Sequence, residues 1–239
     1  MSELFGLLAW GSAGWGDELA AGAAMTIALA LCTLPFGLLL GFGLALARNS
    51  GVKELVTAGD IFTTIFRGLP ELLTIFIIYF GLSILVGKAS VWLTGEPWDL
   101  NQFVAGMIAL GIVFASFASE TIMSAMKAIP GGQREAARAL GMNSFQTWVT
   151  VTMPQLIRYA LPGLSNLWLV LLKETALVSV IALSDLLRMT NIAVGNTKEP
   201  FFFYLVCCLI YLGFALLSSI FIGAIEKWTN RGEAARGPA

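Results

Sequence analysis

The sequence predicts an all-α integral membrane protein with about five transmembrane helices. Of its 239 residues, 57% are hydrophobic and only 12% are charged, a balance that a water-soluble domain does not have. Long apolar runs alternate with polar connectors, and a chain of this length has room for roughly five or six spans of about 20 residues each. One larger polar segment, residues 127–154, interrupts this pattern.

The first part of the chain is predicted to hold a surface segment and the first span. Residues 1–18 contain Trp10 and Trp15 beside acidic side chains, and we expect an extracytoplasmic segment there because tryptophan favours the boundary between bilayer and water. Residues 19–47 contain no charged side chain and are predicted as the first transmembrane helix. The glycines expected to allow close contact between helices are Gly37, Gly41 and Gly43.

Four further spans complete the predicted transmembrane domain, which covers residues 19–226. They are expected at about residues 61–86, 103–126, 159–183 and 201–225. At the second of them, Pro70 suits the first turn of a helix and places Glu71 near the positive end of the helix dipole. The polar, glycine-rich residues 227–239 are expected to form a cytoplasmic tail.

The polar segment 127–154 is predicted to contain two short helical stretches. Pro130 and the two glycines after it stop the preceding helix. Residues 133–140 then have a helical pattern that Gly141 ends, because glycine is favoured just past a helix C-terminus.

The second stretch opens at Asn143, which with Gln146 three residues later matches a capping box, and Pro154 is expected to end it. Apolar side chains of the first stretch are predicted to share one face, with charged side chains around it, as on a docking surface. These apolar residues are Ala136, Ala137 and Leu140. The alternative is an ordinary solvated loop, since loops between membrane helices are often basic and helical.

This segment resembles the EAA loop of ABC-importer permeases. The matching residues are Glu135, Ala136, Ala137, Gly141 and Pro154. Val151 and Met153 replace the isoleucine and leucine of the family pattern, both mild apolar changes. The resemblance implies a type I ABC-importer permease fold, in which this loop is the cytoplasmic coupling helix that sits in a groove of the ATPase subunit. The residues expected to make that contact are Glu135, Ala136, Ala137, Leu140, Gly141 and Pro154.

Motifs elsewhere resemble the polar amino acid permeases within that family. They are Arg67-Gly68-Leu69-Pro70, Ser119-Glu120-Thr121, Leu161-Pro162-Gly163 and residues 175–179. An acid at Glu71 and the run Glu199-Pro200-Phe201 are most similar to the histidine, arginine, lysine, ornithine and opine group. The resemblance implies a permease subunit that moves such solutes by alternating access, driven by ATP hydrolysis on partner subunits.

The same resemblance implies the partners. They are a second permease subunit (homologous or identical), two cytoplasmic ATP-binding subunits that carry ATP and Mg²⁺, and a periplasmic solute-binding protein. No cofactor is expected in this chain itself. The expected location is the bacterial inner membrane.

The residues give little support for an enzyme. The chain has no histidine, and the run Gly81–Lys88 fails as a phosphate-binding loop because its spacing is one residue too long and Ala89 replaces serine or threonine. The cysteines lie in apolar runs without metal-binding spacing, so no metal site is expected. A net charge of −1 offers no argument for nucleic acid.

Ionisable residues within the predicted spans are expensive to expose to lipid and therefore mark functional or structural sites. The predicted solute path comprises Glu71, Tyr79, Glu120 and Glu174, whose carboxylates could meet an ammonium or guanidinium group. The alternative for the acids is structural, through hydrogen bonds to neighbouring backbone. Lys173 is expected to form a structural ion pair with an acid of another helix.

The distribution of basic residues predicts the orientation. If residues 127–154 are cytoplasmic, nine basic residues lie inside and three outside, as the positive-inside rule requires. The inside set is Arg48, Lys53, Lys127, Arg134, Arg138, Arg158, Lys227, Arg231 and Arg236, and the outside set is Lys88, Arg188 and Lys198. Five spans then place the N-terminus in the periplasm and the C-terminus in the cytoplasm.

A rival hypothesis is a secondary amino acid transporter driven by an ion gradient, in which the intramembrane carboxylates bind protons or sodium. It accounts for the acids but gives no role to the EAA-like loop.

Overall fold

The computed structural model describes residues 4, 6–11 and 14–230, and the regular structure of this part is helical throughout. Five helical segments are long and apolar enough to cross a membrane, as the sequence predicts. They are α2 (Gly16–Arg48), α4 (Glu71–Thr94), α5 (Gln102–Ala128), the segment Ser144–Ile181 that includes α8 (Met153–Glu174), and α10 (Pro200–Asn230). The shorter helices are α3 (Lys53–Gly68), α6 (Gly131–Ala139), α7 (Ser144–Thr147) and α9 (Leu186–Thr197). The predicted tail beyond residue 230 lies outside the described residues.

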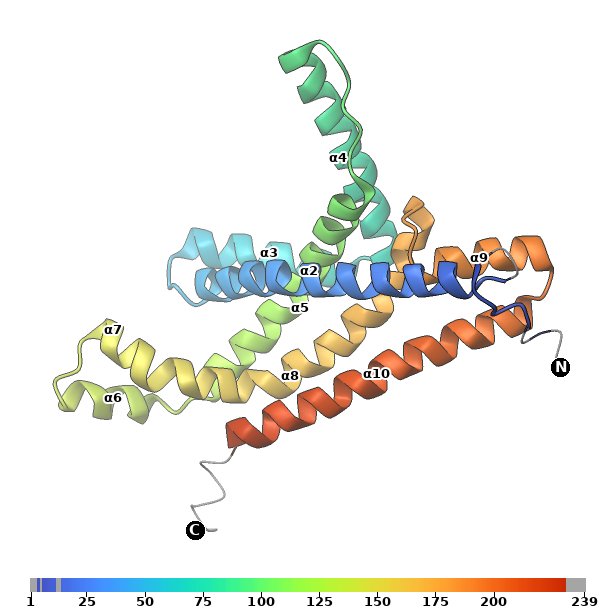
Figure 1. Ribbon diagram of the computed structural model, residues 1–239. Coiled ribbons are helices and arrows are strands. Elements are labelled where there is room, and N and C mark those ends of the chain that lie inside the picture. The colour runs from blue at the N-terminus through green and yellow to red at the C-terminus, as the bar shows by residue number, and fades with distance from the viewer. Residues whose placement is uncertain (1–3, 5, 12–13, 231–239) are drawn as a thin grey trace.

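Helix α5 lies at the centre of the bundle, in contact with α2, α3, α4 and α8 (Figure 1). Its start is set by Asn101, whose side chain accepts hydrogen bonds from the backbone N–H groups of Phe103 and Val104, as an N-cap residue does. Leu110 of α5 is buried in one cluster with Leu29 of α2. Two of the three buried clusters in the described part of the chain include α5, and the third lies between α2, α9 and α10.

Helices α2 and α5 pack closely because glycines leave room on α2. A Cβ atom added to Gly37 would lie 2.6 Å from Cδ1 of Phe114, and one added to Gly41 would lie 2.9 Å from the carbonyl oxygen of Ala115. Both predicted contacts are confirmed. The prediction for Gly43 is wrong, since nothing lies within 4 Å of a Cβ atom added there.

The predicted second span, residues 61–86, is wrong at both ends. Its first residues belong to a separate helix, α3, whereas the spanning helix α4 starts at Glu71, directly after Pro70, which the sequence predicts to lie at a helix start. Leu69 has extended backbone, with φ −86° and ψ 145°, because the proline ring disfavours the helical conformation of the preceding residue. Helix α4 then continues to Thr94, beyond the predicted end.

The predicted fourth span, residues 159–183, starts too late. The chain is helical from Ser144 onward, passing from α7 through a π-helical turn at Trp148–Thr152 into α8, and it ends in a 3₁₀ turn at Thr175–Ile181. Pro154 does not end the helical stretch as predicted. It occupies the first turn of α8, where the missing N–H group of proline is tolerated.

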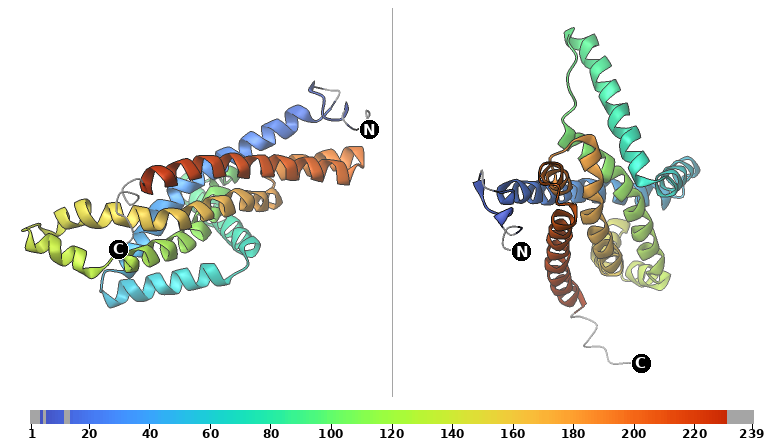
Figure 2. Two further views of the ribbon diagram at one scale, coloured as in Figure 1. Left: turned by 90° about the horizontal axis from the view of Figure 1, so that it is seen from below. Right: turned by 90° about the vertical axis from the view of Figure 1, so that its right-hand side faces the viewer.

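Two parts of the molecule stand apart from the bundle. Helices α6 and α7 form the end farthest from the N-terminus, and α4 projects as an arm along which residues 95–101 return (Figures 1 and 2). Only 11% of the most apolar stretch of α4 is buried, against 61% for α5. The surface of α4 is therefore available to lipid or to another subunit.

Candidate functional site

Helix α6 ends in a backbone arrangement that only a few residue types can adopt. The backbone N–H of Met142 donates to the carbonyl of Ala137 at 3.1 Å, and the N–H of Gly141 donates to the carbonyl of Arg138 at 2.9 Å. This pair of bonds is the Schellman motif, which needs a left-handed residue after the helix. Gly141 supplies it, with φ +79°, so the predicted helix end is confirmed.

The turn into α7 is held by the capping box that the sequence predicts. The Asn143 side chain accepts from the backbone N–H of Gln146 at 2.8 Å, and the Gln146 side chain accepts from the N–H of Asn143 at 2.9 Å. Helices α6 and α7, with the first π-helical residues up to Val149, therefore form a defined unit, which we call the knob (residues 131–149).

The three apolar residues predicted to share one face of the first helical stretch differ in burial. Ala137 is 3% exposed and packs inside the knob, whereas Leu140 is 79% exposed and Ala136 is also exposed. Phe145, which sequence reasoning missed, is 76% exposed. Its position in the first turn after the capping residue Asn143 was the one indication that the sequence offered. The exposed apolar residues of the knob are Ala136, Ala139, Leu140, Phe145 and Val149.

The other predicted coupling residues are also exposed. Glu135 is exposed on α6, and Pro154 is exposed on the stem that α8 forms beneath the knob. The knob therefore exposes both apolar and charged side chains at one end of the molecule, a combination suited to contact with another protein.

Two of the predicted path acids lie near each other although they are far apart in sequence. Glu71 is the first residue of α4 and Glu174 is the last residue of α8, and their carboxyl groups are close enough to interact. Among the described residues neither forms an ion pair with lysine or arginine, and the ion pair predicted for Lys173 is not formed.

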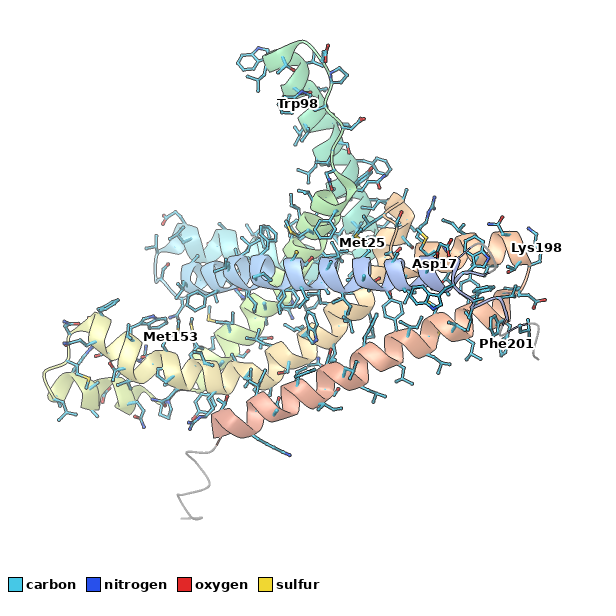
Figure 3. All side chains as sticks on the ribbon, viewed as in Figure 1. Asp17, Met25, Trp98, Met153, Lys198 and Phe201 are labelled. Atoms are coloured by element: carbon cyan, nitrogen blue, oxygen red, sulfur yellow. The ribbon has the colours of Figure 1, made fainter. Side chains whose placement is uncertain are left out.

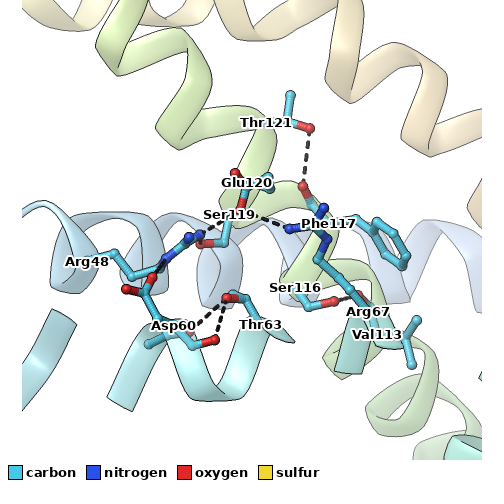
Figure 4. Close-up of polar contacts among 11 residues, drawn as sticks. Arg48, Asp60, Thr63, Arg67, Val113, Ser116, Phe117, Ser119, Glu120 and Thr121 are labelled. Atoms are coloured by element: carbon cyan, nitrogen blue, oxygen red, sulfur yellow. Dashed lines mark hydrogen bonds and ion pairs between the residues drawn. The ribbon is translucent and has the colours of Figure 1, made fainter. Parts of the chain in front are cut away.

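Glu120 lies instead in an ion-pair network with Arg48, Asp60 and Arg67 (Figure 4). Its Oε2 atom accepts from Nη1 of Arg48 at 3.1 Å and from Nη1 of Arg67 at 3.0 Å. Nε of Arg48 also donates to Oδ1 of Asp60 at 2.7 Å, and the Arg67 guanidinium lies 5.8 Å from the centre of the Phe117 ring. The network joins α2, α3 and α5, and sequence reasoning missed its pairing.

The structure has pockets at two of the predicted path residues. Tyr79 lines a pocket of about 620 Å³ between α4, residues 98–101, the start of α5 and α2, which we call the outer pocket. Glu120 lines a pocket of about 420 Å³ between α5 and Tyr159 of α8, which we call the inner pocket. The predicted path residues therefore occupy an outer pocket, a carboxyl pair and an inner pocket.

A further buried acid, which the sequence analysis did not single out, lies at the start of α9, beside a hydrogen bond that joins α9 to α2. Asp185 is fully buried and caps α9 by accepting from the backbone N–H of Arg188 at 3.0 Å. Burial raises the pKa of Asp185 to about 6. The next N–H, that of Leu186, donates to the hydroxyl of Thr26 on α2 at 3.1 Å.

Comparison with known proteins gives one consistent answer. The family described as "Binding-protein-dependent transport system inner membrane component" matches residues 37–231. The chain is 42% identical to the nopaline transport system permease protein NocQ of Agrobacterium fabrum, over 95% of this chain and 97% of the relative. It is 40% identical to the arginine ABC transporter permease protein ArtQ of Escherichia coli, over 90% and 96%. It is 37% identical to the histidine/lysine/arginine/ornithine transport system permease protein HisQ of Salmonella typhimurium, over 90% and 94%.

Solved structures agree with these relatives. A crystal structure of an amino acid ABC transporter with histidines superposes with a TM-score of 0.76 at 31% identity, covering 89% of this chain and 94% of that chain. The inward-facing MetNI methionine ABC transporter gives a TM-score of 0.67 at 17% identity, covering 89% and 96%. At that identity the second match supports the fold alone.

Proposed function

The chain belongs to the family of binding-protein-dependent transport system inner membrane components, the permease subunits of ABC importers, and we propose that the solute it conducts is a cationic amino acid or an opine. The relatives named for arginine, for histidine with lysine, arginine and ornithine, and for nopaline support this substrate class.

The observation that carries the substrate proposal is the proximity of Glu71 and Glu174. Two carboxylates in a medium of low polarity repel each other unless a proton or a cation lies between them. A guanidinium or ammonium group of the solute would satisfy both. Glu71 and Glu174 are therefore the proposed intramembrane contacts of the cationic group, with Tyr79 on the outer side of the path.

Glu120 fits the path less well than these two acids. Its carboxylate is already held by Arg48 and Arg67, and a solute cation would have to displace one of them. We retain Glu120 as a wall residue of the inner pocket and assign its charge to the ion-pair network.

For coupling, we propose that the knob docks in a groove of a cytoplasmic ATPase subunit. Glu135, Ala136, Leu140, Gly141 and Phe145 would provide or shape the contact, while Ala137 and Pro154 would support it from inside and beneath. Helix α5 ends at Ala128, directly before the knob. Displacement of the knob would therefore move α5 and would open the path to one side or the other.

The proposed assembly contains two permease subunits, two ATPase subunits and a periplasmic binding protein. The exposed apolar arm of α4 supports a second permease, identical or homologous, as its neighbour. ATP and Mg²⁺ would bind the ATPase subunits, and this chain would hold neither a catalytic site nor a cofactor. In the inner membrane the N-terminus would face the periplasm and the C-terminus the cytoplasm.

The second candidate is an ion-gradient-driven amino acid transporter, which the Glu71–Glu174 pair favours because two adjacent carboxyl groups can share one proton. That candidate assigns no role to the knob, which is a defined and exposed unit.

The deciding experiment is uptake into proteoliposomes that contain the assembled complex and its binding protein. The solutes would be arginine, histidine, lysine, octopine, nopaline and glutamine. ATP-dependent, vanadate-sensitive uptake with preference for guanidinium-bearing solutes is the expected result. Uptake that follows an imposed proton or sodium gradient without ATP would instead establish the secondary transporter, and preference for glutamine would refute the cationic substrate class.

A further inference from the structure

We propose that the outer pocket is a binding site for the cationic side chain of the solute, in which Asp99 and Trp98 are recognition residues. This inference rests on the proposed function and adds a site that precedes Glu71 and Glu174 on the path. At about 620 Å³, the pocket lies within the range of roughly 300–1,000 Å³ that small-molecule sites occupy.

The charge of the pocket favours a cation. Of the residues that line it, only Asp99 is charged, and the other polar side chains carry hydroxyl, amide or indole N–H groups. With Asp99 and no lysine or arginine among the lining residues, an approaching guanidinium group gains an attractive partner without a competing cation.

Aromatic rings line the same pocket as this carboxylate. Tyr79, Trp98 and Phe103 contribute to its wall, and the face of an aromatic ring attracts a guanidinium group through cation–π interaction and stacking. The ring of Tyr79 is held edge-on by Phe80, with centroids 5.3 Å apart. Aromatic faces beside one carboxylate form a recognisable arrangement for a flat cation.

The segment that carries Trp98 and Asp99 is attached to α4 by a hydrogen bond. The backbone N–H of Trp98 donates to the hydroxyl of Ser90 at 2.8 Å, and Ser90 is 3% exposed on α4. This bond ties the returning segment, residues 95–101, to the arm. The backbone that carries Trp98 and Asp99 therefore stays beside α4.

The pocket lies in the half of the bundle away from the knob. Its wall includes Met25 in the first half of α2, Gln102 at the start of α5 and Leu183 just after the Ser144–Ile181 segment. Figure 3 shows Trp98 on the arm and Met25 on α2, while Met153 marks the side of α8 nearest the knob. With the knob in the cytoplasm, a solute released by a periplasmic binding protein would meet this pocket first.

Two other roles compete with this proposal. Trp98 is 59% exposed, and tryptophan is common at membrane surfaces without any ligand. The same surface could also receive the binding protein itself. The experiment therefore has to report on the pocket directly and to separate the solute from the protein.

The test uses the assembled complex in lipid nanodiscs, with Ser83→Cys introduced in the pocket wall as a reporter. A charged, water-soluble thiol reagent labels the introduced thiol, and the complex without this change gives the background from Cys32, Cys207 and Cys208. Arginine and citrulline serve as probes, because citrulline has nearly the shape of arginine but no charge.

Arginine is expected to slow the labelling at lower concentration than citrulline does. Asp99→Asn should raise the arginine concentration for half-protection by about fivefold and leave citrulline unchanged, and Trp98→Leu should weaken arginine by a similar factor. Glu96→Gln is the matched control, since Glu96 is an exposed acid on the same segment that does not line the pocket. It should have no effect.

Three outcomes would overturn the proposal. The first is the absence of protection by arginine, and the second is an unchanged preference for arginine in Asp99→Asn. The third is protection of the thiol by the binding protein, with or without bound solute, while free arginine gives none, which would identify a protein-docking surface. If wild-type proteoliposomes fail to take up any cationic solute, the proposed function fails as well. Normal arginine uptake with an unprotected thiol removes this inference alone.

Discussion

The guanidinium group of Arg67, at the end of α3, lies 3.0 Å from the carboxylate of Glu120 on α5. The same carboxylate oxygen lies 3.1 Å from Arg48 at the end of α2. Glu120 thus joins α2 and α3 to α5, the helix that leads into the knob. Because its carboxylate already has two cationic partners, Glu120 is expected to hold these helices together rather than to bind solute.

We therefore predict that Glu120→Gln reduces uptake of cationic and neutral solutes by the same factor. The thermal unfolding midpoint of the purified complex should fall by about 2–4 °C, since the loss of a half-exposed ion pair costs about 1 kcal/mol. Radiolabelled uptake and thermal denaturation would provide both measurements. Glu71→Gln is the comparison variant and should weaken cationic solutes selectively. If Glu120→Gln reduced uptake of cationic solutes more than uptake of neutral solutes, Glu120 would be a residue of the solute path instead.

Gly141 offers a test of the knob that depends on backbone conformation. Its φ of +79° costs an L-residue with a Cβ atom about 1–2 kcal/mol, whereas asparagine tolerates this conformation better. Gly141→Arg, which adds a long cation to this strain, should uncouple ATP hydrolysis from uptake. Gly141→Ala should do so partially and Gly141→Asn least. Solute-stimulated ATPase activity, measured together with uptake, reports the coupling. Wild-type activity and uptake in all three variants would show that this turn has no part in the mechanism.

The exposed apolar side chains of the knob should contribute to binding rather than to folding. Leu140→Ser and Phe145→Ser are each expected to weaken ATPase-subunit binding by roughly tenfold, as central apolar contacts do, without lowering the unfolding midpoint of the isolated permease. Ala137→Leu should instead lower the unfolding midpoint of the isolated permease, because overpacking a buried position costs about 1–3 kcal/mol. Gln133→Ala, at an exposed polar position of α6, is the control. Affinity would be measured with immobilised permease and titrated ATPase subunit.

Asp185 predicts a pH dependence of stability. Burial raises its pKa to about 6 from an ordinary value of 3.8, so the folded protein holds this proton more tightly than the unfolded chain. The stabilisation from Asp185 is complete below the ordinary pKa and is lost as the pH rises through about 6. Each tenfold difference in proton affinity is worth about 1.4 kcal/mol.

The matched variant for this prediction is Asp185→Asn, which keeps an oxygen acceptor for the N–H of Arg188 but cannot ionise. Between pH 5 and pH 7 the unfolding midpoint of the wild-type protein should fall relative to that of the variant, and above pH 7 the difference should become constant. Parallel midpoint curves for the two proteins across this range would contradict the assignment.

Helix boundaries show where local sequence was sufficient. Gly141 and the Asn143–Gln146 capping box were predictable because each acts on backbone groups within a few residues of itself. The helix start at Pro70 was predictable for the same reason. The start of the second span at residue 61 was wrong, because residues 61–68 belong to the separate helix α3.

By itself the sequence determined the membrane class, the number of long apolar helices and the local turns of the knob. These depend on apolar length and on turn residues at short spacing, both of which are local properties. Only the tertiary structure decided that Glu120 pairs with Arg48 and Arg67, that Glu71 lies near Glu174, and that Asp99 and Trp98 line a pocket with Tyr79. Each of these relationships joins residues on different elements of the chain, and helix packing, rather than any local pattern, brings them together.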